Sequence, residues 1–151
     1  MTSRDAPDLA RLAQRYGEAW NAHDLDAVMA MHTDDTVFRL HLLDAPEITG
    51  RTAVRDGFAG LLALWPDIFF STDALVLGGG FFVHQYVITG TLAAPMPFGA
   101  ALAHPTGTAV RFAGVDVITV CGERVHRKET YLDTAGAAAR LGLFDAVGAA
   151  R

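Results

Sequence analysis

This sequence contains a single cysteine, few charged residues and no long cluster of basic residues. Cys121 is the single cysteine among 151 residues, so no disulfide can form within the chain. The six histidines and the cysteine show none of the close spacings that build zinc sites, and we expect no metal and no other cofactor. Charged residues make up 19% of the chain, the net charge is −5, and the longest basic cluster is Arg127-Lys128. Nucleic acid is therefore not expected as a partner.

Long apolar runs are also missing. No stretch approaches the roughly eighteen apolar residues of a membrane-spanning helix, and residues 1–7 lack the apolar centre of a signal peptide. We therefore expect a soluble, cytoplasmic protein with no membrane partner. A chain of 151 residues can bury a substantial core but is short for two, so a single domain over residues 1–151 is expected.

Predicted helices come before predicted strands, which indicates an α+β fold. The first helix should run from Asp5 to near His23, with Asp24 capping a short second helix. A third helix should follow Gly50 and end at Pro66. Strands are expected at residues 36–42, 69–77, 81–92, 109–120 and 124–132, and a short helix at residues 134–141.

The connections indicate a curved, antiparallel or mixed sheet. Residues 78–80 are three glycines with no helix start after them, which favours a hairpin turn over a phosphate-binding loop. Residues 93–108 contain three prolines and two glycines and are expected to form a long loop, and loops of this length often serve as lids or binding loops. Three helices against the concave face of such a sheet make a cone with a pocket between the layers.

Asp116 is the residue that most needs an explanation. It is the only charge in residues 113–120, a β-branched run typical of a strand buried on both faces. A lone carboxylate there costs several kcal/mol or has its pKa raised until it carries a proton, unless a partner offsets its burial. A raised carboxyl pKa suits acid–base chemistry near neutral pH. The alternative is a strand end or bulge at which Asp116 reaches water.

Strand alternation places Asp116 on one side of its strand with Val110, Phe112, Gly114, Ile118 and Val120. The opposite side is also mainly apolar, unlike a sheet with one face in water. We therefore expect a second subunit to cover the face away from the helices, in a homodimer or homotetramer assembled through the sheet.

Several polar and aromatic side chains are candidates for ligand contacts, with core packing or a solvated face as the alternative for each. Arg39 and His41 share a face of the first strand, so both enter the pocket or both avoid it. The other candidates are Tyr16 and Trp20 on the first helix, His84 and Tyr86 on one strand face, and the aromatics Phe38, Phe58, Trp65, Phe69 and Phe112. No role is assigned to His23, His32 or His126.

A set of short segments resembles the SnoaL-like polyketide cyclases in order and spacing, from about residue 9 to residue 143. The segments are residues 49–55 (Thr-Gly-Arg-Thr-Ala-Val-Arg), 65–67 (Trp-Pro-Asp), 89–91 (Thr-Gly-Thr), 105–107 (Pro-Thr-Gly), 114–118 (Gly-Val-Asp-Val-Ile), 131–133 (Tyr-Leu-Asp) and 141–143 (Leu-Gly-Leu). The resemblance implies the cone-shaped fold named after nuclear transport factor two. It is less specific for activity.

The resemblance implies cofactor-free intramolecular aldol ring closure of a polyketide ester, with Asp116 matching the aspartate that acts as acid and base in those cyclases. A histidine usually assists. His104, beside the Pro-Thr-Gly match, is the candidate here, with a solvated loop residue as the alternative; Leu92 stands where many members place a histidine. The expected partner is a small hydrophobic molecule that contains carbonyl groups, folded into a reactive shape by an apolar pocket.

Three other functions fit the same fold. Ketosteroid isomerases use an aspartate early in the first strand, and residues 36–43 contain no carboxylate. Epoxide hydrolases of this fold need an arginine and an aspartate on the strand that matches residues 81–92, where neither occurs. The third alternative is a non-catalytic module that binds a small hydrophobic ligand or mediates dimerisation.

Overall fold

The computed structural model describes residues 5–43 and 45–144, and its helices agree with the sequence patterns. α1 (Asp5–Asn21) is followed by α2 (Leu25–Ala30), whose cap Asp24 accepts a hydrogen bond from the Ala27 N–H at 3.0 Å. α3 (Arg51–Leu64) starts after Gly50, whose φ of 95° favours glycine. α4 (Thr134–Arg140) is capped by Asp133. The α+β class is confirmed.

Six strands form one curved sheet in the order β2-β1-β8-β7-β4-β3. Their bounds are β1 (His32–His41), β2 (Ile48–Thr49), β3 (Phe69–Leu77), β4 (Phe81–Gly90), β7 (Val110–Cys121) and β8 (Arg124–Leu132). Neighbouring strands are antiparallel except β1 and β8, which run parallel, so the sheet is mixed. β5 (Met96–Phe98) and β6 (Ala101–Ala103) form a separate two-stranded hairpin.

The strand predictions were wrong in three places. β1 begins at His32 rather than at residue 36, because its first residues pair with β8 across a register shift. Residues 93–108, expected to be a loop, contain the β5–β6 hairpin, with Gly99 at φ 61° in its turn. The two-residue strand β2 is too short to leave a sequence pattern. The three glycines do form the turn between β3 and β4.

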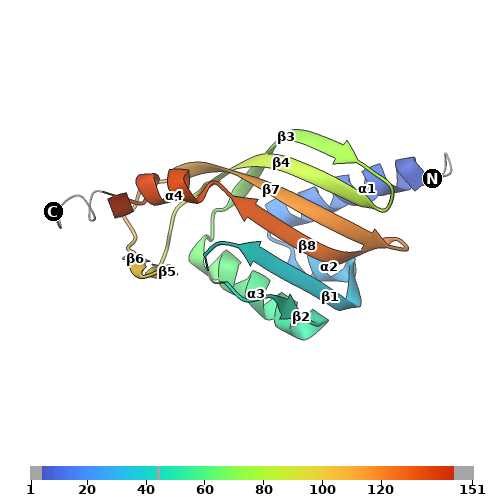
Figure 1. Ribbon diagram of the computed structural model, residues 1–151, viewed down its shortest axis with the longest axis horizontal. Helices are drawn as coiled ribbons and strands as arrows, with labels where there is room; N and C mark the ends of the chain where they lie inside the picture. Colours follow the sequence, from blue (N-terminus) through green and yellow to red (C-terminus); the bar gives the residue numbers. More distant parts are fainter. Residues whose placement is uncertain (1–4, 44, 145–151) are drawn as a thin grey trace.

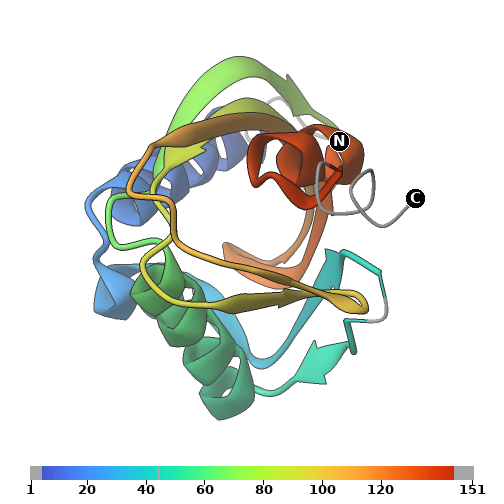
Figure 2. The ribbon, with the colours of Figure 1, turned by 90° about the vertical axis from the view of Figure 1, so that its left-hand side faces the viewer.

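Helices α1, α2 and α3 pack on the concave side of the sheet, and α4 lies at one end of it (Figure 1). One core cluster joins α1 and α3 to the sheet through residues such as Trp20, Phe58 and Phe82. A second cluster, with Trp65, Phe112 and others, extends toward α4 and the β5–β6 hairpin. Figure 2 looks along the molecule from the end that carries α4. It shows the sheet curling over α1 and α3, with β5 and β6 crossing that end. No helix in the described ranges is long and apolar enough to span a membrane.

The strand of Asp116 was predicted to be buried on both faces, but within this chain only its inner face is buried. Within this chain Val110, Phe112, Gly114, Asp116 and Ile118 are buried, as the alternation predicts. The residues between them are half-buried or exposed, because no element of the chain packs on that face in the described ranges. A second subunit over this face stays a prediction.

Candidate functional site

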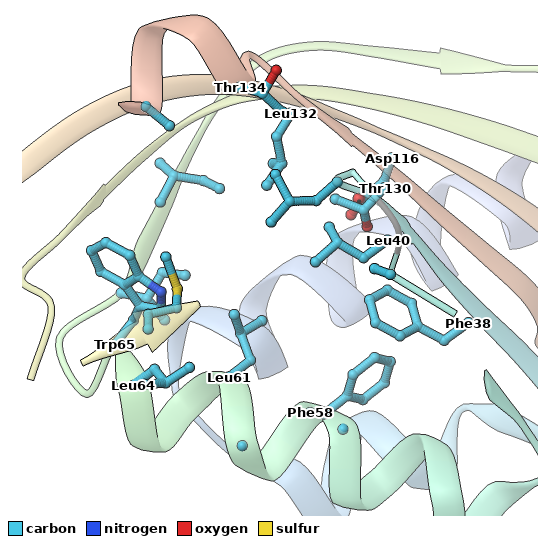
Figure 3. A pocket seen from close by; sticks show the side chains of 18 of the residues that line it. Phe38, Leu40, Phe58, Leu61, Leu64, Trp65, Asp116, Thr130, Leu132 and Thr134 are labelled. Carbon is cyan, nitrogen blue, oxygen red and sulfur yellow. Dashed lines mark hydrogen bonds between the residues drawn. The ribbon is translucent and has the colours of Figure 1, made fainter. Parts of the chain in front are cut away.

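A large apolar cavity lies between the helices and the sheet. Its volume is about 970 Å³, which is within the range of small-molecule sites. Helices α1, α3 and α4, the inner face of the sheet and the β5–β6 hairpin all contribute to its wall. Figure 3 shows Phe58, Leu61 and Leu64 pointing from α3 into this space, with Asp116 and Thr130 on the sheet across from them. The cavity predicted from the sequence is present.

Asp116 faces this cavity from β7 and is 4% exposed. Its Oδ1 accepts hydrogen bonds from the Thr130 hydroxyl at 2.6 Å and from the Tyr86 hydroxyl at 2.9 Å. Its Oδ2 accepts a short hydrogen bond from the Lys128 ammonium, so the two side chains form a buried ion pair. The carboxylate is therefore not alone: partners offset its burial, which was one of the options that the sequence left open.

Lys128 brings the second charge into the site. It projects inward from β8 and is 6% exposed. Its Nζ lies 5.3 Å from the centroid of the Trp20 ring and 5.5 Å from that of Tyr16, so the ammonium contacts two aromatic faces as well as Asp116. Among the described residues, Asp116 and Lys128 are the only two charged side chains that line the cavity.

The strand register brings the acid and its donors together. Asp116 lies opposite Thr130 in the β7–β8 pair and opposite His84 in the β4–β7 pair. Because side chains two residues apart share a face, Lys128 and Tyr86 lie diagonally from Asp116 on the same side of the sheet. Three donors on the two flanking strands, Tyr86 on β4 and Lys128 and Thr130 on β8, thus converge on one carboxylate.

Two tyrosines beside the ion pair are kept neutral. Burial, and then the charge of Asp116, raises the pKa of Tyr86 far above its ordinary value of 10. Burial also raises the pKa of Tyr16 well above that value. Both hydroxyls therefore remain hydrogen-bond donors at neutral pH. Burial and the nearby charge of Lys128 lower the pKa of His84, although Asp116 opposes this, and its Nε2 is paired with the Thr72 hydroxyl at 2.7 Å.

His32 holds Tyr16 in place through a chain of hydrogen bonds. The Thr36 hydroxyl donates to the His126 carbonyl at 3.1 Å, so its oxygen accepts from the His32 Nδ1–H at 2.8 Å. The His32 Nε2 is then the acceptor for the Tyr16 hydroxyl at 2.9 Å. Burial, followed by the positive charges of Lys128 and Arg51, lowers the pKa of His32 from 6.5 to about 3. A neutral imidazole thus fixes the orientation of Tyr16.

The structure places most of the proposed ligand contacts at the cavity but leaves Arg39, His41 and Phe69 outside it. The candidates at the cavity wall are Tyr16, Trp20, Phe38, Phe58, Trp65, His84, Tyr86 and Phe112. Arg39 and His41 lie on the other side of β1, whose Phe38 and Leu40 face inward. His41 instead bonds Glu129 at 3.0 Å and stacks on Tyr131.

His104 is also outside. It is exposed in the connection that follows β6 and is not part of the cavity wall, so the structure does not bring it to Asp116. Phe69, another aromatic candidate, is 50% exposed, because β3 turns its neighbour Phe70 inward.

Sequence reasoning did not select Lys128, Thr130 or His32. One signal for Lys128 was available: it is the only lysine of the chain, and the other eleven basic residues are arginines. Alternation along residues 124–132 also separates Lys128 and Thr130 from the charged face that carries Arg127 and Glu129. His32 lies before the predicted start of its strand, so no pattern placed it in the core.

The catalytic residues of the ketosteroid isomerases and epoxide hydrolases that share this fold are not reproduced at this cavity. β1 starts early enough to include Asp34 and Asp35, but both are exposed and pair with Arg51 and His126 outside the cavity. β4 contributes His84 and Tyr86 rather than an arginine and an aspartate. Among the described residues, no group of three or more His, Cys, Asp or Glu side chains is arranged to hold a metal ion.

Comparisons with known proteins agree with this architecture. The model of the SnoaL-like domain family matches residues 13–127, so the chain belongs to that family. The fold is the one named after nuclear transport factor two, shared with solved relatives. No curated protein matches the sequence.

Two solved structures, both provisionally named as polyketide cyclases, illustrate the likeness. The SnoaL-like protein from Jannaschia sp. CCS1 is 17% identical with a TM-score of 0.78, and the match covers 89% of this chain and 92% of that one. A protein from Xanthomonas campestris pv. campestris is 20% identical with a TM-score of 0.77, covering 89% of this chain and 97% of that one.

A third structure, IdmH from Streptomyces antibioticus, also provisionally named as a polyketide cyclase, is 21% identical with a TM-score of 0.70. That match covers 88% of this chain and 97% of IdmH. At these identities the three likenesses establish the fold.

Proposed function

We propose that this protein is a cofactor-free acid–base enzyme that closes a ring in a polyketide-type carbonyl substrate by an intramolecular aldol reaction. The observation that carries the proposal is a single buried carboxylate, Asp116, paired with Lys128 at the wall of a mainly apolar cavity of about 970 Å³. Membership of the SnoaL-like family supports it.

The site contains the parts that such a reaction needs. A methylene between two carbonyls is already acidic, so the Asp116 carboxylate can remove its proton. The Lys128 ammonium, which pairs with Asp116, would supply positive charge to stabilise the enolate oxygen of a bound substrate. The aromatic and aliphatic wall would hold a flexible chain with its two reacting carbons close together, an effect that can contribute roughly 7 to 11 kcal/mol to lowering the barrier.

One observation favours a second candidate, a non-catalytic module for small hydrophobic ligands. Both oxygens of Asp116 already accept hydrogen bonds from Tyr86, Thr130 and Lys128, which is an arrangement that a purely structural buried carboxylate also needs. The two candidates differ in whether a bound carbonyl compound is converted.

The test is incubation with an aromatic polyketide ester that carries an uncyclised diketone side chain. Ring closure is followed by chromatography with mass detection, for the wild type, Asp116→Asn and the control Asp73→Asn. Asp73 is exposed on β3, so its variant makes the same chemical change away from the cavity. We expect the wild type and the control to close the ring, and Asp116→Asn to be slower by roughly 10² to 10⁴.

Binding of the same ester is measured in parallel through tryptophan fluorescence, because Trp20 and Trp65 both line the cavity. Saturable binding without conversion by the wild type would favour the ligand-binding module. Equal conversion by the wild type and Asp116→Asn would remove Asp116 from the mechanism.

A further inference from the structure

The chain uses lysine once and places it in the cavity. Every other basic residue is an arginine, including those on the outer face of β8, while Lys128 projects inward from the same strand. Arginine is the better residue for a permanent buried ion pair, since its guanidinium keeps its proton and can bond a carboxylate through two N–H groups. A primary amine differs in that it can lose its proton and attack a carbonyl carbon.

We propose that Lys128 is a catalytic nucleophile that forms a Schiff base with a ketone or aldehyde group of the bound ligand. The inference rests on the proposed function, in that it takes the ligand to be a carbonyl compound. Nζ lies at the cavity wall against the Trp20 and Tyr16 rings, on the side of the sheet where such a ligand would be held. In this scheme these rings shield the imine from bulk water until the ring has closed.

Asp116 can transfer the protons that this chemistry requires. In the first step a proton moves from Nζ to Oδ2 along their hydrogen bond, leaving a neutral amine and a neutral acid. The amine then forms a bond to the carbonyl carbon while the C=O π electrons move to oxygen, which takes the proton from the neutral Asp116 acid to become a hydroxyl and leaves Asp116 as a carboxylate. Nζ gives up its second proton, and loss of that hydroxyl as water, with the proton returned by Asp116, produces the protonated imine.

The imine makes the same aldol reaction easier. Its positive nitrogen takes up the electron pair when the Asp116 carboxylate removes a proton from the adjacent carbon, so the product of that step is a neutral enamine. The enamine carbon attacks the second carbonyl, whose oxygen is protonated, and one water hydrolyses the resulting imine and frees Lys128. The water released at the start balances the water consumed at the end, and no oxidant or reductant is needed.

The neighbours of Asp116 fit this role. Thr130 and Tyr86 both donate to Oδ1, which fixes the carboxylate plane and leaves Oδ2 to exchange a proton with Nζ. His32 holds the Tyr16 hydroxyl and thereby the ring below Nζ. Thr130, Tyr86 and His32 are positioning residues, since none of the three reacts with the ligand in this scheme.

The experiment traps the imine on the intact protein. Wild type is incubated with benzylacetone, a small aryl ketone, and sodium cyanoborohydride, and the product is analysed by intact mass and peptide mapping. The expected result is a mass gain of one benzylacetone plus two hydrogens minus one water, located on Lys128. Because the chain has no other lysine, the α-amino group at its start is the competing amine, and we expect at least ten-fold less adduct there.

The matched control exchanges two neighbours on β8 in the double variant Arg127→Lys/Lys128→Arg. It has the composition and net charge of the wild type, but its one lysine side chain is on the outer face, so we expect no adduct above the level of the α-amino group. Lys128→Met is the second variant, and circular dichroism of both checks that they fold. No adduct on Lys128 in the wild type, or equal adduct on the outer-face lysine of the folded control, would overturn the proposal.

Ring closure of the diketone ester is measured on the same samples. Turnover by folded Lys128→Met at the wild-type rate would overturn the Schiff base and leave the proposed acid–base function in place. Adduct on Lys128 with no turnover by the wild type would support the nucleophile and count against the proposed cyclase. The two proposals can therefore fail separately.

Discussion

Asp116 on β7 and Lys128 on β8 neutralise each other inside the cavity wall, and each is less than a tenth exposed. Neither has a second opposite charge at the wall among the described residues. The cost of removing both groups from water is offset by their attraction and by the hydroxyls of Thr130 and Tyr86. Each charge therefore depends on the other for its burial.

Removing Lys128 alone should be more harmful than removing the pair. We expect Lys128→Met to lower the free energy of unfolding by about 3 to 5 kcal/mol, because it leaves the Asp116 charge buried without compensation. The double variant Asp116→Asn/Lys128→Met should regain a large part of that loss, because the remaining groups are neutral. Urea unfolding at pH 7 measures all four corners of the cycle. Strictly additive losses would show that the two side chains do not depend on each other.

Gly114 should tolerate no side chain, because Tyr86 occupies the space beside it. A Cβ at this position would lie 2.7 Å from Cε2 of Tyr86 and 3.0 Å from Cδ2 of Leu132. We expect Gly114→Ala to cost about 1 to 3 kcal/mol of stability and to displace the Tyr86 hydroxyl from Asp116. Gly79→Ala is the control, since nothing lies within 4 Å of its Cβ position.

Both glycine variants are compared by urea unfolding and by binding of the polyketide ester. Loss of stability without any change in binding or turnover would mean that Tyr86 does not help to position Asp116. Equal effects of the two substitutions would mean that the close approach at Gly114 is relieved by small shifts.

The sequence predicted the inward direction of Asp116 but not its partners, and the reason is a single bulge. The turn at Gly122 pairs Cys121 with Arg124, and an unbroken ladder from there would place Asp116 opposite Glu129. The register shifts by one residue after Val120 and Val125, so Asp116 faces Thr130 instead. Bulges of this kind leave little trace in composition, and without the shift neither Thr130 nor Lys128 could be assigned to the acid.

Whether the direction of the other candidate side chains could be predicted depended on the element that carries them. The inward direction of Tyr16, Trp20 and Trp65 was predicted correctly, because helical spacing is decided by burial itself, whereas their contact with a ligand stays a prediction. Arg39 and His41 could not be assigned, because one polar pair on a strand fits either face until the neighbours are known. His104 was taken from a motif in a loop, where no periodicity fixes direction.

Filling the cavity should weaken ligand binding without unfolding the protein. Leu61 points from α3 into the space between the layers (Figure 3). We expect Leu61→Phe to reduce the affinity for the polyketide ester by at least ten-fold, about 1.4 kcal/mol, because the added ring occupies volume that the ligand needs. Ala63→Phe on the exposed side of the same helix should leave affinity unchanged. Fluorescence titration compares them, and equal affinities would mean that the ligand binds elsewhere.

His32 should make the fold sensitive to mild acid. Its pKa is about 3 in the folded chain and 6.5 when exposed, so between these values the unfolded state binds the extra proton. Stability contributed by the neutral imidazole is therefore complete above pH 6.5 and decreases as the pH falls, by about 1.4 kcal/mol per unit. The lowered pKa of His84 acts in the same direction, whereas the lowered carboxyl pKa values of Asp35, Asp67 and Glu129 take effect only at lower pH.

The window from pH 6.5 to 5 therefore isolates the histidines, and His32→Gln separates the two. Glutamine can keep hydrogen bonds to Tyr16 and Thr36 but does not titrate, so the variant should be less stable at pH 7 yet lose less stability on acidification. Urea unfolding at several pH values gives both slopes, with His84→Gln as the matched control. If His32→Gln keeps the wild-type slope while His84→Gln flattens it, the acid sensitivity arises on β4 and the neutral His32 behind Tyr16 is not its source.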